Sequence, residues 1–426
     1  MSHSSPCPVV IIGTGPYGLS LAAHLEARGV EYRIFGKPMD LWRSHVPRGM
    51  MLKSDGFASN LSAPIAGATL KDYCSRFQIP YADRGFPVPV ADFVDYADWF
   101  RRRFVGHLDE RMVADVAQGD DGYNLTLEDG ATFRAEQVVL AVGITWFSSL
   151  PREFDGLPQG LISHSYDHRT VDQFAGRKVV VLGAGASAVN LAYELDLAGA
   201  KATLLVRKDR IEYHERRASK RGTLVHRLLH RLKMISSPVG PGWKSWFCCI
   251  FPALFYALSE NLRRRSLRSH LKPAAGWFMR NRVEKKVQAI LGRSIEAVET
   301  KEAGLSLRLS DGSTLDCDHV ICATGYDMNP KRLTFLSPGI AAAIARPGYN
   351  CFVGRDFQTA LPGLYAIGPM AMENFGPLLR FMAGAEYVSP RLARTLAWRT
   401  RISGLRRKLA GMAQSIGLRP ATVPQS

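Results

Sequence analysis

The sequence predicts an α/β fold with two nucleotide-binding units, because two glycine-rich turns occur in the same local context. The first turn, residues 13–18 (GTGPYG), follows the apolar run 9–12 (VVII), and the second, residues 183–188 (GAGASA), follows 178–182 (KVVVL). Each turn separates a β-branched run typical of a buried strand from an alanine- and leucine-rich stretch typical of a helix. Dinucleotides bind in this strand–turn–helix context.

The small residues of each turn have separate roles. The first glycine allows the tight bend, the second glycine lets the backbone approach a pyrophosphate, and the third small residue lets the helix pack on the strand. The unpaired N–H groups of the helix N-terminus then face the phosphates. These positions are occupied by Gly13, Gly15 and Gly18 in the first turn and by Gly183, Gly185 and Ala188 in the second. Together the turns predict that the chain holds two nucleotides at once.

The first third of the chain is predicted to form a βαβ unit and a hairpin. Gly29 ends the first helix, and Asp129-Gly130 is a hairpin signal within an alternating segment. Residues 42–61 are irregular and dotted with glycine and serine, which is typical of a loop that crosses a site. The predicted elements are strands at 8–12, 31–35 and 137–141, helices at 17–28, 70–77 and 93–104, and a hairpin within 113–133.

The rest of the chain repeats the unit and then adds to it. Proline and glycine cluster at 150–160, which marks a crossover. The second βαβ unit covers 176–207, and a helical insertion rich in basic and aromatic residues follows at 211–286. The remaining predicted elements are strands at 305–309, 318–322 and 363–368, and a helix that opens at 375–377 and runs toward Leu396.

A length of 426 residues fits two or three domains. We expect a discontinuous first domain, residues 1–150 and 320–400, with the second domain, 151–319, inserted between its halves. The second domain includes the helical insertion, and residues 401–426 form a basic C-terminal tail.

The formal net charge is +17, with Lys and Arg concentrated at 207–286 and 391–419. No nucleic-acid-binding motif accompanies these residues. We interpret the charge as a solvated basic face that also attracts a phosphate-bearing cofactor, and we expect no nucleic-acid partner.

The seven cysteines do not predict a disulfide framework. The one close pair, Cys248-Cys249, is adjacent and lies in an apolar run, which suits neither a zinc site nor a C-x-x-C redox site. We therefore predict a reduced, cytoplasmic setting and no metal site. The first strand begins too early for a signal peptide to precede it, and the longest apolar stretch, 246–258, is shorter than the ~20 residues of a bilayer span.

Three features make the chain resemble the class B flavin-dependent monooxygenases, a group of flavin-containing, N-hydroxylating and Baeyer–Villiger enzymes. They are the two glycine turns, the stretch 160–166 (GLISHSY) and the stretch 322–326 (CATGY). The resemblance covers roughly residues 8–396 apart from the insertion. It implies two Rossmann-like domains, with an NAD(P) domain inserted in a discontinuous FAD domain.

In such enzymes the first turn holds the FAD pyrophosphate. The acid that usually follows the second strand and binds the adenine ribose is absent, and Lys37 lies there instead, where it can reach a phosphate. The Gly-Asp pair expected near the flavin keeps only its glycine, Gly368. The resemblance implies the following FAD-binding residues: Gly13, Gly15, Pro16, Tyr17, Gly18, Lys37, Trp42 and Gly368.

The second turn has the form associated with a nicotinamide cofactor. Arg207 follows the next strand and can grip a 2′-phosphate through paired charge-assisted bonds, which favours NADPH; the alternative is a surface charge at a strand end. The Ala-Thr-Gly stretch lets the backbone pass close to a cofactor, or else forms only a tight turn. The residues assigned here are Gly183, Gly185, Ser187, Ala188, Arg207, Ala323, Thr324 and Gly325.

Four residues are candidates for a direct part in the reaction. His164 lies where the family's identifying motif has a histidine; it acts at the nicotinamide or hydrogen-bonds a domain hinge. Lys53, Ser54 and Asn60 lie near the isoalloxazine if the loop follows the family's path, and there they would order O2 and the polar edge of the flavin. The alternative for each is an ordinary surface loop.

The resemblance implies an oxidoreductase in which NADPH reduces FAD, O2 forms a C4a-(hydro)peroxyflavin, and one oxygen atom passes to nitrogen, sulfur or a carbonyl of a small organic substrate. The insertion is interpreted as a lid for a bulky apolar or acidic substrate, as a surface that rests on an anionic membrane, or as a packing core. Two rival functions are a flavoprotein reductase or dehydrogenase without oxygenation and a non-enzymatic, membrane-associated flavin-binding protein.

Overall fold

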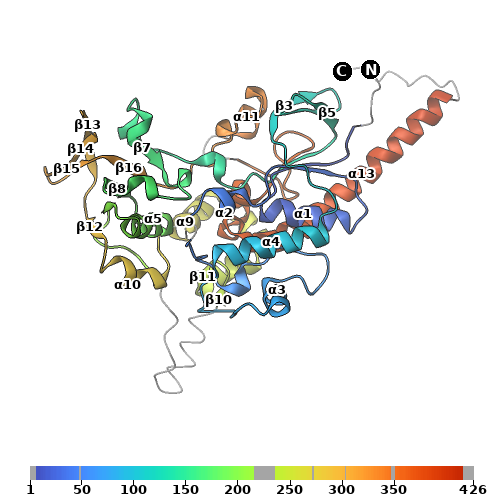
Figure 1. Cartoon of the computed structure of the whole chain (residues 1–426). Helices are drawn as coiled ribbons and strands as arrows, with labels where there is room; N and C mark the ends of the chain where they lie inside the picture. The colour runs from blue at the N-terminus through green and yellow to red at the C-terminus, as the bar shows by residue number, and fades with distance from the viewer. Residues whose placement is uncertain are drawn as a thin grey trace.

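The computed structural model describes residues 6–47, 49–214, 236–270, 273–302, 304–346 and 351–415. Two parallel sheets lie in separate lobes of the molecule (Figure 1). The predicted α/β class with two Rossmann-like units is therefore confirmed.

The first sheet joins strands from both ends of the chain. Its order is β17-β6-β1-β2, and each neighbouring pair is parallel. The strands are β1 (Val10–Ile12), β2 (Arg33–Phe35), β6 (Val138–Leu140) and β17 (Leu364–Ala366). Strands β1, β6 and β17 are wholly buried, as expected for parallel strands covered on both faces. Helix α1 (Pro16–Glu26) packs along the long helix α13 (Ala385–Ser415).

The second sheet has the order β12-β9-β8-β16-β7, again entirely parallel. Its strands are β7 (Ile162–His164), β8 (Lys178–Leu182), β9 (Lys201–Val206), β12 (Gln288–Leu291) and β16 (His319–Cys322). Helix α5 (Ala186–Leu197) connects β8 to β9. β16 lies in this sheet and ends at Cys322, three residues beyond the junction predicted at residue 319, so we propose that the junction lies after Cys322. The other domain bounds remain predictions.

An antiparallel three-stranded sheet precedes β6 in the first nucleotide-binding unit and β16 in the second. The first contains β3 (Val113–Gly119), β4 (Gly122–Leu127) and β5 (Thr132–Ala135), and the second contains β13 (Ile295–Lys301), β14 (Gly304–Leu309) and β15 (Thr314–Cys317). The hairpin predicted at Asp129-Gly130 is confirmed as the β4–β5 turn. The duplication therefore extends beyond the βαβ units.

The described part of the insertion is mainly helical; residues 215–235 and 271–272 of this prediction lie outside it. A short hairpin, β10 (Ser236–Ser237) and β11 (Gly240–Pro241), leads into four helices. These are α7 (Trp243–Ile250), α8 (Pro252–Ala257), α9 (Glu260–His270) and α10 (Arg280–Val283).

The helix predicted to open at 375–377 does not begin there. Gly376 has φ +94°, a conformation that a helix interior excludes, and two 3-10 turns, Pro377–Arg380 and Met382–Gly384, follow it. Helix α13 begins only at Ala385 and continues to Ser415. Residues 401–415 of the predicted tail are thus part of this helix.

The remaining helices connect the sheets and flank the first lobe. They are α2 (Asp40–Ser44), α3 (Leu70–Phe77), α4 (Val90–Phe104), α11 (Pro338–Ile344) and α12 (Met372–Phe375). Helix α3 has the predicted bounds because a capping box of Thr69 and Asp72 fixes its start. Among the helices of the described part, none is both long enough and apolar enough to cross a bilayer.

Candidate cofactor and substrate site

The first glycine turn is shaped by contacts that leave no room for side chains at two positions. Gly13 has φ +111°, and a Cβ there would lie 2.4 Å from the carbonyl oxygen of Ala141 at the end of β6. A Cβ on Gly18 would lie 1.9 Å from the carbonyl oxygen of Gly13. Gly15, in contrast, has open space: a Cβ there would meet no atom within 4 Å. The N-terminus of α1 therefore faces an open space at the position where a pyrophosphate was predicted.

This open space belongs to a cavity of about 950 Å³. That volume is at the upper end of the range for cofactor and ligand pockets, ~300–1,000 Å³. The predicted residues that line it are Gly13, Gly15, Pro16, Tyr17, Lys37, Trp42, Lys53 and Ser54. The turn, the position after β2 and the loop 51–55 are thus brought together in one cavity.

Gly18 and Gly368 do not line the cavity; they make room for neighbouring atoms beneath it. A Cβ on Gly368 would lie 3.1 Å from the ring of Tyr17, and one on Gly384 would lie 2.1 Å from its hydroxyl oxygen. The Tyr17 hydroxyl lies 2.8 Å from the carbonyl oxygen of Leu379 and 2.9 Å from that of Phe381, so that its proton is shared between them. Tyr17 therefore fixes the backbone on both sides of Arg380, whose side chain lines the cavity.

Lys53 and Arg380 bring two positive charges into the same cavity. The loop before Lys53 is fixed by a 2.7 Å hydrogen bond from Leu52 N–H to the carbonyl oxygen of Val88. Burial, with the charge of Arg380 as a second cause, lowers the pKa of Lys53 from 10.5 to about 8. Burial also lowers the pKa of Arg380. Within the described residues, neither side chain forms an ion pair with a carboxylate.

The insertion closes part of this cavity. The β10–β11 hairpin, residues 237–241, lines it together with Tyr213, His214, His270 and Trp277. Burial and the nearby charge of Lys53 lower the pKa of His214 to about 4, so this imidazole is neutral at pH 7. The insertion thus supplies aromatic and neutral polar groups on the side of the cavity that holds the two cations.

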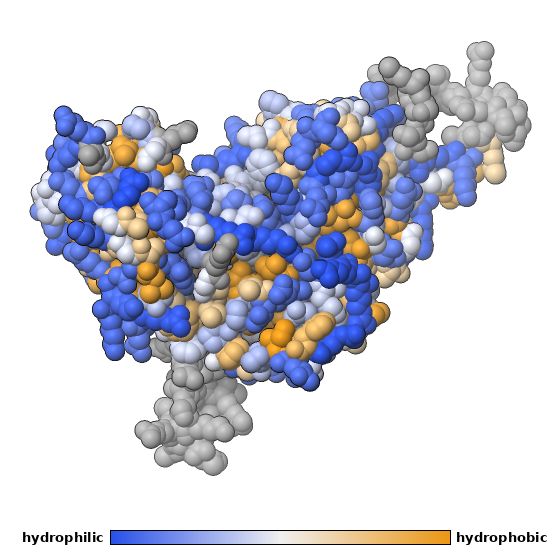
Figure 2. Space-filling view, viewed as in Figure 1, coloured by the Kyte–Doolittle hydropathy of each residue, from blue (hydrophilic) through white to orange (hydrophobic). Residues whose placement is uncertain are grey.

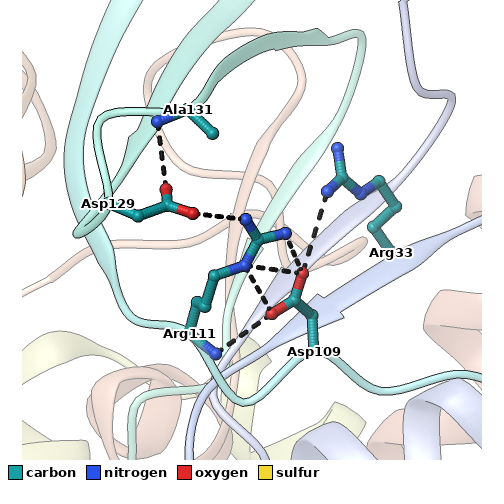
Figure 3. A network of polar contacts seen from close by, with 5 residues as sticks. All are labelled: Arg33, Asp109, Arg111, Asp129 and Ala131. Atoms are coloured by element: carbon teal, nitrogen blue, oxygen red, sulfur yellow. Dashed lines mark hydrogen bonds and ion pairs between the residues drawn. The ribbon is translucent and has the colours of Figure 1, made fainter.

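A charged network stabilises the segment after β2, where the expected acid is missing (Figure 3). Asp109 accepts hydrogen bonds from Arg111 Nε at 2.9 Å and Nη2 at 2.6 Å, and Arg33 lies 3.9 Å away. Arg111 also bonds Asp129 at 2.6 Å. The hydrogen bonds to Arg111 lower the pKa of Asp109. The network holds this segment against Gly36, whose N–H donates to the carbonyl oxygen of Asp109, but Asp109 is engaged by arginine and does not replace a ribose ligand.

The second turn repeats the geometry of the first but lies outside the large cavity. Gly183 has φ +135°, and a Cβ there would lie 2.6 Å from the carbonyl oxygen of Ala323. A Cβ on Gly185 would meet only Pro273, at 3.8 Å. Ser187 lines a separate small cavity of about 30 Å³, which has room for a water molecule only. Arg207 is exposed at the end of β9.

His164 lies where the chain crosses between the lobes and does not line the large cavity. Its Nε2 lies 3.1 Å from the carbonyl oxygen of Gly325, and its Nδ1 accepts from Tyr166 N–H at 3.1 Å. Burial lowers its pKa, and this hydrogen bonding fits a neutral ring protonated at Nε2. Thr324 donates to the carbonyl oxygen of Ser149 at 2.7 Å, so hydrogen bonds of both His164 and Thr324 fix the segment that crosses between the lobes.

Asn60 is separated from the other loop candidates. Its amide donates to the carbonyl oxygen of Phe57 at 3.0 Å and accepts from Leu70 N–H at 2.9 Å, which connects the loop to the start of α3. Ser54 bonds Ser59 at 2.9 Å and still lines the cavity.

The sequence interpretation did not include Arg380, His214 or Ala141. A signal for Arg380 exists: it is the one charged residue in the apolar run 374–385. A charged residue in such a run is expected to be buried, and charged residues are rarely buried unless a partner compensates the charge. Ala141 ends the strand predicted at 137–141 but was not assigned to a cofactor, and no local signal marks His214.

Comparison with known proteins places these features in a family. The family model described as pyridine nucleotide-disulphide oxidoreductase matches residues 7–228 and 260–395. An indole-3-pyruvate monooxygenase of Oryza sativa subsp. japonica is 29% identical over 46% of this chain and about half its own length, 47%. A probable indole-3-pyruvate monooxygenase of Arabidopsis thaliana is 24% identical over 84% of this chain and 83% of its own.

Two solved structures are similar over nearly the whole chain. An ornithine N-hydroxylase of Kutzneria sp. 744, with reduced FAD, NADP⁺ and L-ornithine, has a TM-score of 0.73 at 15% identity and covers 92% of this chain and 99% of its own. An ornithine hydroxylase of Pseudomonas aeruginosa has a TM-score of 0.70 at 18% identity, with the same coverage. At these identities the likeness shows a shared fold.

Proposed function

This chain belongs to the pyridine nucleotide-disulphide oxidoreductase family, and on that premise we propose that it is an FAD- and NADPH-dependent monooxygenase. The observation that carries the proposal is the large cavity. It begins at the first glycine turn and ends at Lys53 and Arg380 under the insertion, and no cysteine is among the described residues that line it. A disulfide reductase needs a redox-active thiol at the flavin, so the thiol-free cavity supports oxygenation of a bound substrate.

The residues of the first lobe fit FAD. Gly13 and Gly18 shape the turn, Gly15 leaves space for the pyrophosphate, and the N–H groups at the start of α1 face it. Among the Lys and Arg residues that line the cavity, Lys37 is the nearest in sequence to the turn, and it can reach the phosphates. Bound FAD, once reduced by NADPH, supplies the O2-activating chemistry; the protein binds and orients the reactants and keeps water out.

The second turn fits NADPH. Gly183 and Gly185 repeat the geometry of the first site, and Arg207 is exposed in the position from which it can pair with a 2′-phosphate. His164 and Thr324 tie the crossing between the lobes, which supports a positioning role for His164 over direct contact with the nicotinamide.

The substrate is proposed to be a small organic acid with an apolar body. Lys53 and Arg380 offer two cationic groups to a carboxylate, while Trp277 and the 237–241 hairpin offer an apolar wall. Transfer of the oxygen atom to nitrogen fits such a substrate when it also carries an amine. Lys53 is therefore assigned to substrate binding, and Ser54 remains a candidate for contact with the flavin edge.

The purified protein provides the test. We expect a flavin absorption spectrum, and NADPH oxidation that consumes O2 and becomes coupled to product when the acidic substrate is added. Arg207→Ala should raise the KM for NADPH at least tenfold and leave the KM for NADH nearly unchanged, since one charge-assisted pair is lost. A protein that binds FAD and oxidises NADPH only with an added electron acceptor is instead the reductase.

The setting of the enzyme is proposed on two further observations. All seven cysteines are free, which supports a reducing compartment such as the cytoplasm. In the insertion, Trp243, Ile250 and Leu254 are more than half exposed, which supports the alternative that this segment contacts a membrane. Both Phe255 and Cys248 are buried, so part of the insertion is a packing core as well as a wall of the cavity.

A further inference from the structure

Helix α13 has one face that belongs to the body of the molecule. Val388, Leu392 and Leu396 are fully buried on this face. One turn further on, Thr400 accepts a hydrogen bond from the amide of Gln137 at 3.1 Å. Beyond it the helix projects from the first lobe toward the right edge of Figure 1. The helix is therefore anchored by its first half and extends outward with its second.

The opposite face carries an apolar stripe. Trp398, Ile402, Leu405 and Leu409 are spaced by four, three and four residues, which places them one above another on a single face. The exposed fractions of Trp398, Leu405 and Leu409 are 63%, 59% and 56%. Figure 2 shows most of this view as hydrophilic, with apolar residues in separate patches. An ordered run of large exposed apolar side chains on one helix is unusual for a surface and marks a contact site.

Basic residues flank the stripe on both sides. Arg401 and Lys408 lie along one edge and Arg406 along the other, and none of the three forms an ion pair with a described residue. Arg399 and Arg407 differ, because they turn toward the body and pair with Asp356 and Glu136.

The composition of this region is one-sided. Residues 387–426 contain eight Lys or Arg and no Asp or Glu. The uncompensated positive charge of the whole chain is therefore concentrated partly at this helix.

The charge decides which partner fits the stripe. If two copies paired through it as a coiled coil, parallel or antiparallel, Arg401, Arg406 and Lys408 would face one another across the seam and repel. An anionic lipid surface has the complementary charge and also accepts the apolar side chains. The long stems of Arg and Lys can then reach up to the headgroups while Trp398 and the leucines enter the acyl boundary.

We propose that the outer face of α13, residues 398–409, docks the protein onto an anionic membrane surface. The segment is about 17 Å long, which allows it to lie in the plane of the interface without spanning the bilayer. The site differs from the exposed residues of the insertion, and it needs neither cofactor nor substrate. The test of membrane docking is therefore independent of the proposed monooxygenase function.

The test is sedimentation of the FAD-loaded full chain with vesicles of phosphatidylcholine, alone or with phosphatidylserine. We expect binding only to the vesicles with phosphatidylserine, weakened by added salt. Replacing Arg401, Arg406 and Lys408 by Gln should weaken binding by about fivefold per charge. Leu405→Ser with Leu409→Ser should weaken it by about tenfold per leucine. Since both sets lie on the exposed face, the melting temperature and the bound flavin should not change.

The matched control is Ile65→Ser with Leu197→Ser, which removes two leucine-sized exposed groups that lie outside both α13 and the insertion. It should leave vesicle binding unchanged. Equal binding to both kinds of vesicle, or loss of binding only in this control, would overturn the proposal. So would a stripe variant that converts a dimer to a monomer in analytical ultracentrifugation without affecting vesicle binding. Quenching of Trp398 by brominated phosphatidylserine, lost in Trp398→Phe, would place the helix itself at the acyl boundary.

Discussion

Single residues of the two turns show why similar glycines are not equivalent. Gly13 and Gly183 are needed for the fold, since each has a positive φ and a backbone carbonyl within 3 Å of where a Cβ would lie. Gly15 has an ordinary φ and open space around it. The packing of the protein therefore does not require a glycine at this position, and we propose that the ligand does.

Gly15→Ala should therefore separate folding from cofactor binding. The added methyl group meets no protein atom but enters the space in front of α1, so FAD binding should weaken by at least tenfold while the apoprotein melts at the same temperature. Bound flavin is measured by absorbance after gel filtration. Gly339→Ala, which also meets no atom, is the control and should keep its flavin. Full retention of flavin in Gly15→Ala would contradict the first site.

Lys53 should impose a pH dependence on acidic substrates. Its pKa of about 8 means that the charge is present below pH 8 and lost above it, so kcat/KM for a carboxylate substrate should fall as pH rises through 8. Lys53→Met should remove this limb and raise KM about tenfold to hundredfold, the range expected for a lost hydrogen bond to a charged group. The methyl ester of the substrate should show neither effect. Lys71→Met, at an exposed lysine, is the control.

The same shift predicts the sign of a stability effect. Because the folded pKa of Lys53 lies below its ordinary 10.5, the buried charge costs stability below pH 8 and this cost disappears between pH 8 and 10.5. Lys53→Met should therefore not lower the melting temperature at pH 7. A marked decrease would indicate that Lys53 has a structural partner.

At the scale of elements, strands and helices next to a turn signal were predictable and those set by distant contacts were not. Strands β1 and β8 and helices α3 and α4 follow from apolar runs, capping residues and amphipathic spacing. The start of α13 does not, because residues 377–384 would suit a helix locally. Their 3-10 turns are fixed by Tyr17, 362 residues away from Leu379 in sequence.

The residues of the candidate site also divide into those that local sequence predicts and those that distant contacts position. The turn, Lys37 and Lys53 were predictable, because the glycine motif and the loop that follows it along the chain indicate their positions. Arg380 was not, since its position depends on that hydrogen bond of Tyr17. Local patterns contain no information on a contact between the first and last elements of a domain.

Tyr17→Phe should loosen this connection. Both carbonyl groups of Leu379 and Phe381 lose a buried donor, which should cost about 1–3 kcal/mol in the free energy of unfolding. The displaced Arg380 should also raise KM for an acidic substrate, while FAD stays bound. Tyr32→Phe is the control, since its hydroxyl bonds Glu26 at the surface. Unchanged stability and unchanged KM in Tyr17→Phe would refute the positioning role.

At the scale of the whole molecule, FAD should act as part of the first lobe. A cavity of about 950 Å³ between α1, the 51–55 loop and the insertion leaves the apoprotein without many internal contacts. FAD at 100 times its Kd should add about 2.7 kcal/mol of stability, which corresponds to a rise of several degrees in Tm. Differential scanning fluorimetry of stripped and reloaded protein measures this. An identical Tm with and without FAD would mean that the cavity does not bind it.

The second nucleotide should add a comparable amount of stability. NADP⁺ at the same multiple of its Kd should raise the free energy of unfolding as much as FAD, because a ligand that binds only the folded state stabilises it by RT ln(1 + [L]/Kd), whichever site it occupies. Hydrogen exchange should show FAD protection at α1 and at residues 379–381, and NADP⁺ protection at the start of α5.

The position of β17 in the first sheet has a consequence for biosynthesis. β17 is the partner of β6, yet it is translated 224 residues after Leu140, the last residue of β6. At ~5–20 residues per second, a ribosome needs about 10–45 s to cover this distance. The ribosome synthesises the second lobe in that interval, and during this time one edge of β6 in the first lobe has no partner strand. Newborn chains of this protein should therefore depend on chaperones before release from the ribosome.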